Sequence, residues 1–135
     1  MKKYISKICV LVAVCILFTS TTSYAAGETF SFIFNSKTTA ASSNLYVKNS
    51  NKAYAEVTIK KTNLKKGEKV EFFICDQRGN RVTDVVTYTG ESNKLILKYK
   101  SYTVLESIKL RKAYRLVAYY KGKNVRVVAG ELILW

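Results

Sequence analysis

The sequence of 135 residues contains no histidine and no proline, and it contains only three cysteines. Without histidine, the chain can form neither a Ser-His-Asp triad nor a Cys-His dyad, and it has no imidazole to bind a metal ion. Its nine acidic residues do not form the closely spaced set of a calcium-binding loop. We therefore expect a protein that binds no metal and no cofactor and is not an enzyme.

Residues 1–25 have the three parts of a secretory signal peptide. Three lysines near the start precede an apolar run of 11 residues, Ile8–Phe18, and Ser23-Tyr24-Ala25 places small residues where a signal peptidase cleaves. The apolar run is about half the roughly 20 residues that are needed to span a bilayer. We expect cleavage after Ala25, a mature domain at 26–135, and no membrane-spanning segment in the mature protein.

Removal of the leader takes away three lysines, two cysteines and no acidic residue. The mature chain keeps 20 basic and 9 acidic residues, a net charge of +11, and Cys75 is its only cysteine. No intramolecular disulfide can form, so an apolar core must stabilise the domain. Because Cys75 lies in a strand pattern, we expect a half-buried structural thiol, and the alternative is an intermolecular disulfide.

Most of the mature sequence alternates apolar and polar residues, which is the period of a β-strand. Five segments alternate in this way, and two more are rich in β-branched residues. They are Thr29–Phe34, Ala55–Lys60, Val70–Cys75, Leu95–Tyr99 and Arg115–Tyr120, with Arg81–Tyr88 and Val125–Trp135 as the β-branched pair. Leu45–Val47 is a further short candidate, and Ser36–Ser43 has the small polar residues of a loop. Seven to eight strands predict an all-β single domain, either an antiparallel β-sandwich or a small barrel.

The last strands favour the sandwich. Tyr114–Tyr120, a glycine turn at Lys121–Asn124 and Val125–Val128 have the pattern of a β-hairpin. The pattern resembles the last hairpin of immunoglobulin-like sandwiches, in which a tyrosine early in the penultimate strand ties down a crossing. Tyr114 has that position, so we expect an immunoglobulin-like β-sandwich. Only Thr103–Glu106 departs from the strand period, and its capping-box spacing predicts a short helix or turn.

Three short motifs resemble a family of small exported proteins of low-GC Gram-positive bacteria whose function is unknown. They are Phe30-Ser31-Phe32-Ile33-Phe34 after the leader, Asn49-Ser50-Asn51-Lys52-Ala53-Tyr54 before a strand pattern, and Val128-Ala129-Gly130 near the end. The resemblance extends over most of the mature chain. It implies export and a β fold, and it brings no active-site residues with it.

Basic residues gather in three parts of the mature sequence, within Lys60–Lys69, Lys109–Arg115 and Lys121–Arg126. Charged residues at turns and edges keep strands from aggregating, which is one explanation for them. The other is attraction to a polyanion, since a positive surface raises the local concentration of an anionic partner. The candidate polyanion-binding residues are Lys65, Lys66, Lys69, Lys109, Arg111, Lys112, Lys121 and Lys123.

Three aromatic residues fall outside the main apolar alternation: Phe73, Tyr119 and Trp135. Most phenylalanine and tyrosine residues in strands are half-buried parts of a sheet. A residue that breaks the alternation projects from the opposite face of its strand. These three residues are therefore candidates for a patch that contacts carbohydrate or protein.

Taken together, these features predict an exported, cationic, non-enzymatic β-sandwich that is secreted or associated with the cell wall. Its expected partner is an anionic polymer of the cell envelope, an anionic membrane surface or another extracellular protein. We expect no nucleic-acid partner, because the protein is exported and has no base-stacking motif. Two alternatives stay open. One is a secreted bacteriocin-like antibacterial protein, and the other is a small extracellular hydrolase that uses two carboxylates.

Overall fold

The computed structural model describes residues 27–48, 52–100 and 112–134, and this part of the chain contains nine β-strands and no helix. The strands are β1 (Glu28–Phe34), β2 (Ala40–Ser42), β3 (Tyr46–Val47), β4 (Tyr54–Thr62), β5 (Val70–Asp76), β6 (Val86–Tyr88), β7 (Lys94–Lys98), β8 (Ala113–Tyr120) and β9 (Arg126–Leu134). The prediction of an all-β fold is confirmed. The expected signal peptide at 1–25 and the expected helix or turn at Thr103–Glu106 lie outside the described residues.

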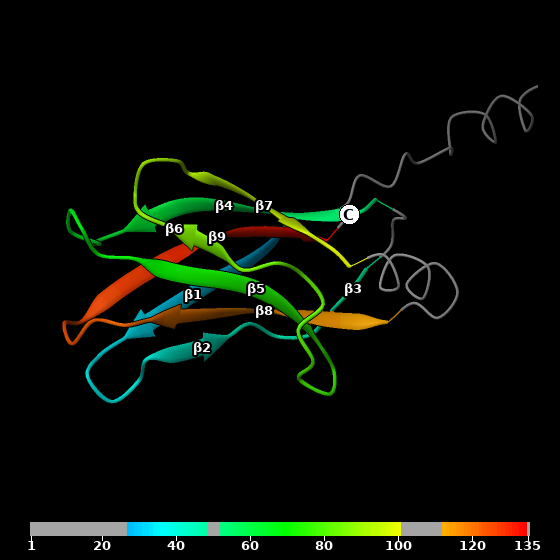
Figure 1. Cartoon of the computed structure of the whole chain (residues 1–135), viewed down its shortest axis with the longest axis horizontal. Coiled ribbons are helices and arrows are strands. Elements are labelled where there is room, and N and C mark those ends of the chain that lie inside the picture. Colours follow the sequence, from blue (N-terminus) through cyan, green and yellow to red (C-terminus); the bar gives the residue numbers. More distant parts are fainter. Residues whose placement is uncertain (1–26, 49–51, 101–111, 135) are drawn as a thin grey trace, which may run out of the picture.

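The strands form two antiparallel sheets that lie one on the other, with the strands running along the long axis of the molecule (Figure 1). The A sheet has the order β1-β9-β4-β7, and the B sheet has the order β2-β8-β5-β6, with β3 also paired to β8. The predicted antiparallel β-sandwich is therefore confirmed. Because β2 and β3 together occupy one edge position, the sheets contain four strand positions each, which is the arrangement of a jelly roll.

The core lies between the sheets, where inward-facing residues alternate with outward-facing ones along each long strand. In β1, Phe30, Phe32 and Phe34 are buried, and the residues between them are exposed. Aromatic rings connect the two sheets, since the Phe30 centroid lies 6.3 Å from that of Phe72 and the Phe34 centroid lies 5.7 Å from that of Tyr120. Each fully buried ring contributes roughly 1.5–3 kcal/mol of transfer free energy. A core of this kind stabilises the domain without a disulfide.

The hairpin predicted from the last two strand patterns is not formed. Strand β8 pairs with β2, β3 and β5 in the B sheet, whereas β9 pairs with β1 and β4 in the A sheet. The segment Lys121–Asn124 therefore crosses between the sheets. Its glycine is required by a close approach, because a Cβ atom on Gly122 would lie 2.0 Å from Tyr120 Oη. The immunoglobulin-like hairpin is thus wrong in its connection, and Tyr114, although fully buried, lies at the start of a jelly-roll strand.

Two segments differ from the predicted strand boundaries. Within Arg81–Tyr88 only Val86–Tyr88 is a strand, because the buried Thr83 leaves the ladder and its Oγ1 atom accepts a hydrogen bond from the Ile74 amide at 2.9 Å. The predicted loop Ser36–Ser43 contains the short strand β2. The short strand expected at Leu45–Val47 is confirmed as β3. Both differences arise at sheet edges. There the pairing of a segment depends on the segments packed beside it and not on its own alternation of apolar and polar residues.

Candidate functional site

The outer face of the B sheet carries the most distinctive group of side chains in the described residues. Alternate residues of a strand point to the same face, so Phe73 and Cys75 project outward from β5 and Arg115 and Tyr119 project outward from β8. The register places Cys75 opposite Arg115 and Phe73 opposite Val117. The pairing of β5 with β8 thus brings the aromatic and the basic side chains onto one surface.

A tight turn between β5 and β6 raises one rim above this face. The Asp76 carboxylate holds the turn, because its Oδ1 atom accepts hydrogen bonds of 2.9 Å from the amides of Arg78 and of Asn80. Gly79 has a φ of 85°, a left-handed conformation that favours glycine. Desolvation would raise the pKa of Asp76, but the hydrogen bonds from Asn80 and Arg78 outweigh it and lower that pKa. The turn is therefore held by a charged carboxylate.

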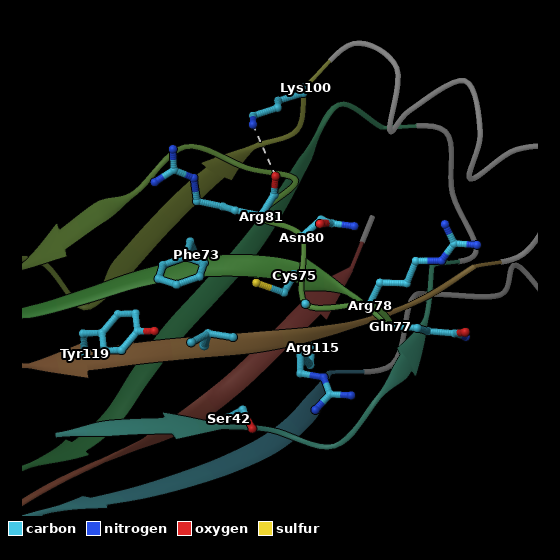
Figure 2. Close-up of a pocket in the computed structure, with 12 residues that line it drawn as sticks. Ser42, Phe73, Cys75, Gln77, Arg78, Asn80, Arg81, Lys100, Arg115 and Tyr119 are labelled. Carbon is cyan, nitrogen blue, oxygen red and sulfur yellow. Dashed lines mark hydrogen bonds between the residues drawn. The ribbon is translucent and has the colours of Figure 1, made fainter. Parts of the chain in front are cut away.

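The rim and the sheet enclose a wide, shallow hollow of about 980 Å³, which we call the cationic depression (Figure 2). Its lining residues come from β2, β5 and β8, from the Asp76–Asn80 turn with the following Arg81, and from Lys100, two residues after β7. They are Ser42, Phe73, Cys75, Gln77, Arg78, Gly79, Asn80, Arg81, Lys100, Arg115, Val117 and Tyr119. None of these residues is acidic, and four of them are cationic.

The four cations of the depression lie beside one charged carboxylate, because Asp76 interacts electrostatically with Arg78. Among the described residues, Arg78, Arg81, Lys100 and Arg115 take part in no ion pair. Lys100 Nζ donates a hydrogen bond of 3.3 Å to the backbone carbonyl of Arg81, which holds the Lys100 side chain over this part of the rim. The Nε atom of Arg115 is buried without a hydrogen-bond partner in the described part of the chain. The depression therefore has an excess of positive charge, which Arg81, Lys100 and Arg115 carry for the most part.

The aromatic residues that break the alternation come together at the opposite side of the depression from Arg78 and Gln77 (Figure 2). The ring centroids of Phe73 and Tyr119 are 5.5 Å apart, and their planes are inclined by 31°. Tyr119 is 42% exposed, which is unusual for a large ring in a sheet. The sequence thus identified two residues of one patch, whereas Trp135 lies outside the described residues.

Cys75 lies at the floor of the depression and is only 5% exposed. Burial raises the pKa of the Cys75 thiol, and the charge of Asp76 raises it further, while Arg115 and Arg81 act in the opposite direction. The thiol is consequently protonated near neutral pH and is a weak nucleophile. Cys75 is thus more deeply buried than the half-buried thiol that the strand pattern predicts.

The predicted lysines of the first and third basic groups meet at one end of the sandwich, which we call the loop end (Figure 1). Lys65, Lys66 and Lys69 lie in or beside the β4–β5 loop, and Lys121 and Lys123 lie in the β8–β9 loop. Glu68 joins the two loops. Its carboxylate accepts hydrogen bonds from Arg126, from Tyr120 Oη at 2.9 Å and from Asn124 Nδ2 at 3.4 Å. Five of the eight candidate cations are therefore neighbours in space.

The remaining candidates lie elsewhere. Lys112 directly precedes β8, at the end of the sandwich away from the loop end, and it lines a small hollow with Asp76, Gln77 and Arg78. Lys109 and Arg111 lie outside the described residues. The structure thus divides the predicted polyanion-binding residues between two ends. Sequence reasoning did not find Arg78, Arg81 and Lys100 because their common surface depends on strand pairing.

Comparison with known proteins adds no family to this description. No protein-family model matches the sequence, and no curated protein matches it either. Within the described residues there is no helix long and apolar enough to cross a membrane. Nor does any set of three or more Asp, Glu or Cys side chains in that part of the chain gather closely enough to hold a metal ion.

Proposed function

We propose that this protein is an exported, non-enzymatic module that binds an anionic polymer of the cell envelope, and that the cationic depression is its binding site. The observation that carries the proposal is a concave surface that is lined by four cations and by no acidic residue, with Asp76 beside Arg78 at its rim. Positive charges that gather without counterions repel one another and lower the stability of the free protein slightly. A bound polyanion removes that repulsion, so the surface is arranged for an anionic partner.

The loop end is less well suited to this role, because carboxylates already compensate part of its charge. Arg126 is paired with Glu68, and Lys121 Nζ lies 3.2 Å from Glu71 Oε1. Lys65, Lys66 and Lys69 line a hollow that also contains the carboxylates of Glu68 and Glu91. Exposed lysines around a loop increase solubility. They attract anions only weakly and do not select an anion by its shape. We assign them a supporting role in long-range attraction.

Retention on isolated Gram-positive cell walls at increasing salt concentration tests the proposal. The variant Arg81→Gln/Lys100→Gln/Arg115→Gln removes three charges from the depression, and its matched control Lys65→Gln/Lys66→Gln/Lys69→Gln removes three from the loop end. We expect the depression variant to elute at clearly lower salt than the control, since salt screens each contact. Equal losses in both variants would mean that only net charge matters. Retention that does not respond to salt would contradict electrostatic binding.

Export is a separate part of the proposal and has its own test. If the leader is removed as the small residues before Ala26 suggest, the protein recovered outside the cell begins at Ala26. N-terminal sequencing or intact-mass measurement of the secreted protein reports this directly. Recovery of the intact leader on extracellular protein, or retention of the protein in the cytoplasm, would overturn it.

A further inference from the structure

The ligand of the depression can be specified further from the side chains that surround it. We propose that it is an anionic glycan whose sugar rings pack on Phe73 and Tyr119 while its acidic groups meet the cations. This inference rests on the proposed function, because it names the class of polymer that the same depression binds. Three features of the depression carry it: the aromatic pair, the distribution of the cations, and the neutral polar groups of its lining.

The first feature is the aromatic platform. Phe73 and Tyr119 are diagonal neighbours on adjacent strands, and Val117 lies opposite Phe73 in the ladder. Together they form an apolar area beside a strongly charged one, on a face that no other described strand covers. One face of a sugar ring consists of C–H groups, and such a face packs against aromatic rings without losing the hydrogen bonds of its hydroxyl groups. A polymer without sugar rings cannot make this packing contact.

The second feature is the spacing between rings and charges. Arg115 and Tyr119 lie four residues apart on β8, and they face the same side. At a rise of about 3.3 Å per residue their Cα atoms are roughly 13 Å apart, which is long enough for a short run of sugar units. Guanidinium groups bind carboxylate and phosphate oxygens through paired hydrogen bonds. A glycan with an acidic group on or beside each sugar ring can therefore contact Tyr119 and Arg115 at the same time.

The third feature is the set of neutral hydrogen-bonding groups. Ser42, Gln77 and Asn80 are the neutral polar residues in the lining of the depression. Amide and hydroxyl side chains both donate and accept hydrogen bonds, as sugar hydroxyls do. A lipid surface offers no run of sugar rings to pack on Phe73 and Tyr119, and this favours a glycan over a membrane.

Calorimetric titration with three probes tests the inference. Polygalacturonate carries a carboxylate on every sugar ring, long-chain polyphosphate carries charge without rings, and dextran carries rings without charge. We expect the wild-type protein to bind polygalacturonate at least tenfold more tightly than polyphosphate and to show no binding of dextran. Preference for polyphosphate over polygalacturonate would overturn the assignment of a glycan.

Variants separate this inference from the proposed function. Phe73→Leu/Tyr119→Leu keeps apolar side chains but removes the rings, and Tyr54→Leu removes an aromatic ring from the outer face of the A sheet as a control. We expect the double variant to lose about tenfold in affinity for polygalacturonate and less than twofold for polyphosphate, while the control is unchanged. If the double variant binds the glycan normally but Arg81→Gln/Arg115→Gln does not, the glycan assignment fails and the proposed function stands. If the wild-type protein binds neither polyanion, both fail.

Discussion

Arg126 donates two parallel hydrogen bonds to the Glu68 carboxylate, from Nε to Oε2 and from Nη2 to Oε1. This ion pair connects the β4–β5 loop to the start of β9. The hydrogen bond from Arg126 is the largest cause that lowers the pKa of Glu68, and the Lys65 amide lowers it further, so that it falls from 4.5 to about 2. Glu68 lies two residues before β5 of the B sheet, whereas Arg126 is the first residue of β9 in the A sheet. The pair therefore fastens the two sheets together at the loop end.

The depressed pKa of Glu68 predicts a loss of stability in acid. A carboxyl group whose pKa is lower in the folded state stabilises that state above its unfolded pKa, and the stabilisation disappears as the pH falls through the folded pKa. For Glu68 that window runs from 4.5 down to about 2. We expect Glu68→Gln to be less stable than the wild type at pH 7, and the difference in unfolding free energy to shrink through this window. Glu71→Gln, at an exposed ion pair, is the control, and a constant difference at all pH values would contradict the assignment.

Gly130 predicts a sharp intolerance to substitution in the middle of β9. A Cβ atom at this position would lie 1.9 Å from the Thr58 carbonyl oxygen, next to the irregular register between Ile59 and Lys61 of β4. Because the obstacle is backbone, the strands must separate, and we expect Gly130→Ala to cost about 1–3 kcal/mol or more. Gly27→Ala is the control, since its nearest contact is a Glu131 side-chain oxygen at 3.4 Å. Chemical denaturation measures both, and equal stabilities would contradict the close approach.

Two neighbouring residues of β1 predict opposite consequences of truncation. Phe34 is 0% exposed between the sheets, whereas Ile33 is 59% exposed on the outer face of the A sheet. Phe34→Ala leaves a cavity beside Tyr120, and we expect a loss of about 3–5 kcal/mol in unfolding free energy. Ile33→Ala should change it by no more than about 0.5 kcal/mol, as is usual for surface positions. Urea unfolding of both variants decides the orientation of the strand.

The buried thiol of Cys75 predicts slow modification. Burial raises its pKa, so the reactive thiolate is scarce and access to it is limited. We expect a thiol reagent such as dithionitrobenzoate to react with the native protein on the order of 100-fold more slowly than with the unfolded protein. A non-reducing gel should show a monomer. Rapid reaction of the native protein, or a disulfide-linked dimer, would place Cys75 at the surface.

The alternation of residues was enough to predict which side chains form the core, but not which strands are neighbours. Phe30, Phe32 and Phe34 are buried as the alternation indicates, and the β-sandwich follows from it. Alternation states only which face of a strand is apolar. It says nothing about the partner strand, and for that reason the segments that became β8 and β9 were assigned to one hairpin although they lie in different sheets.

The residues of the candidate site could likewise be predicted from the sequence only in part. Phe73 and Tyr119 were identified because they break the alternation, and the ladder between β5 and β8 places them 5.5 Å apart. Arg81 and Lys100, by contrast, are brought together by bridges between Cys75 and Arg81 and between Thr83 and Tyr99. Residues 19 positions apart in sequence meet through pairings of single residues, and no local pattern encodes such pairings. Charge clusters along the chain therefore pointed to the loop end and not to the depression.

The position of β9 has a consequence for how the protein is made. It is the last strand of the described chain, and it lies between β1 and β4 inside the A sheet. A growing polypeptide that stops short of β9 leaves β1 without a partner and splits the sheet in two. Because β9 pairs with both β1 and β4, the A sheet can close only after β9 has been synthesised.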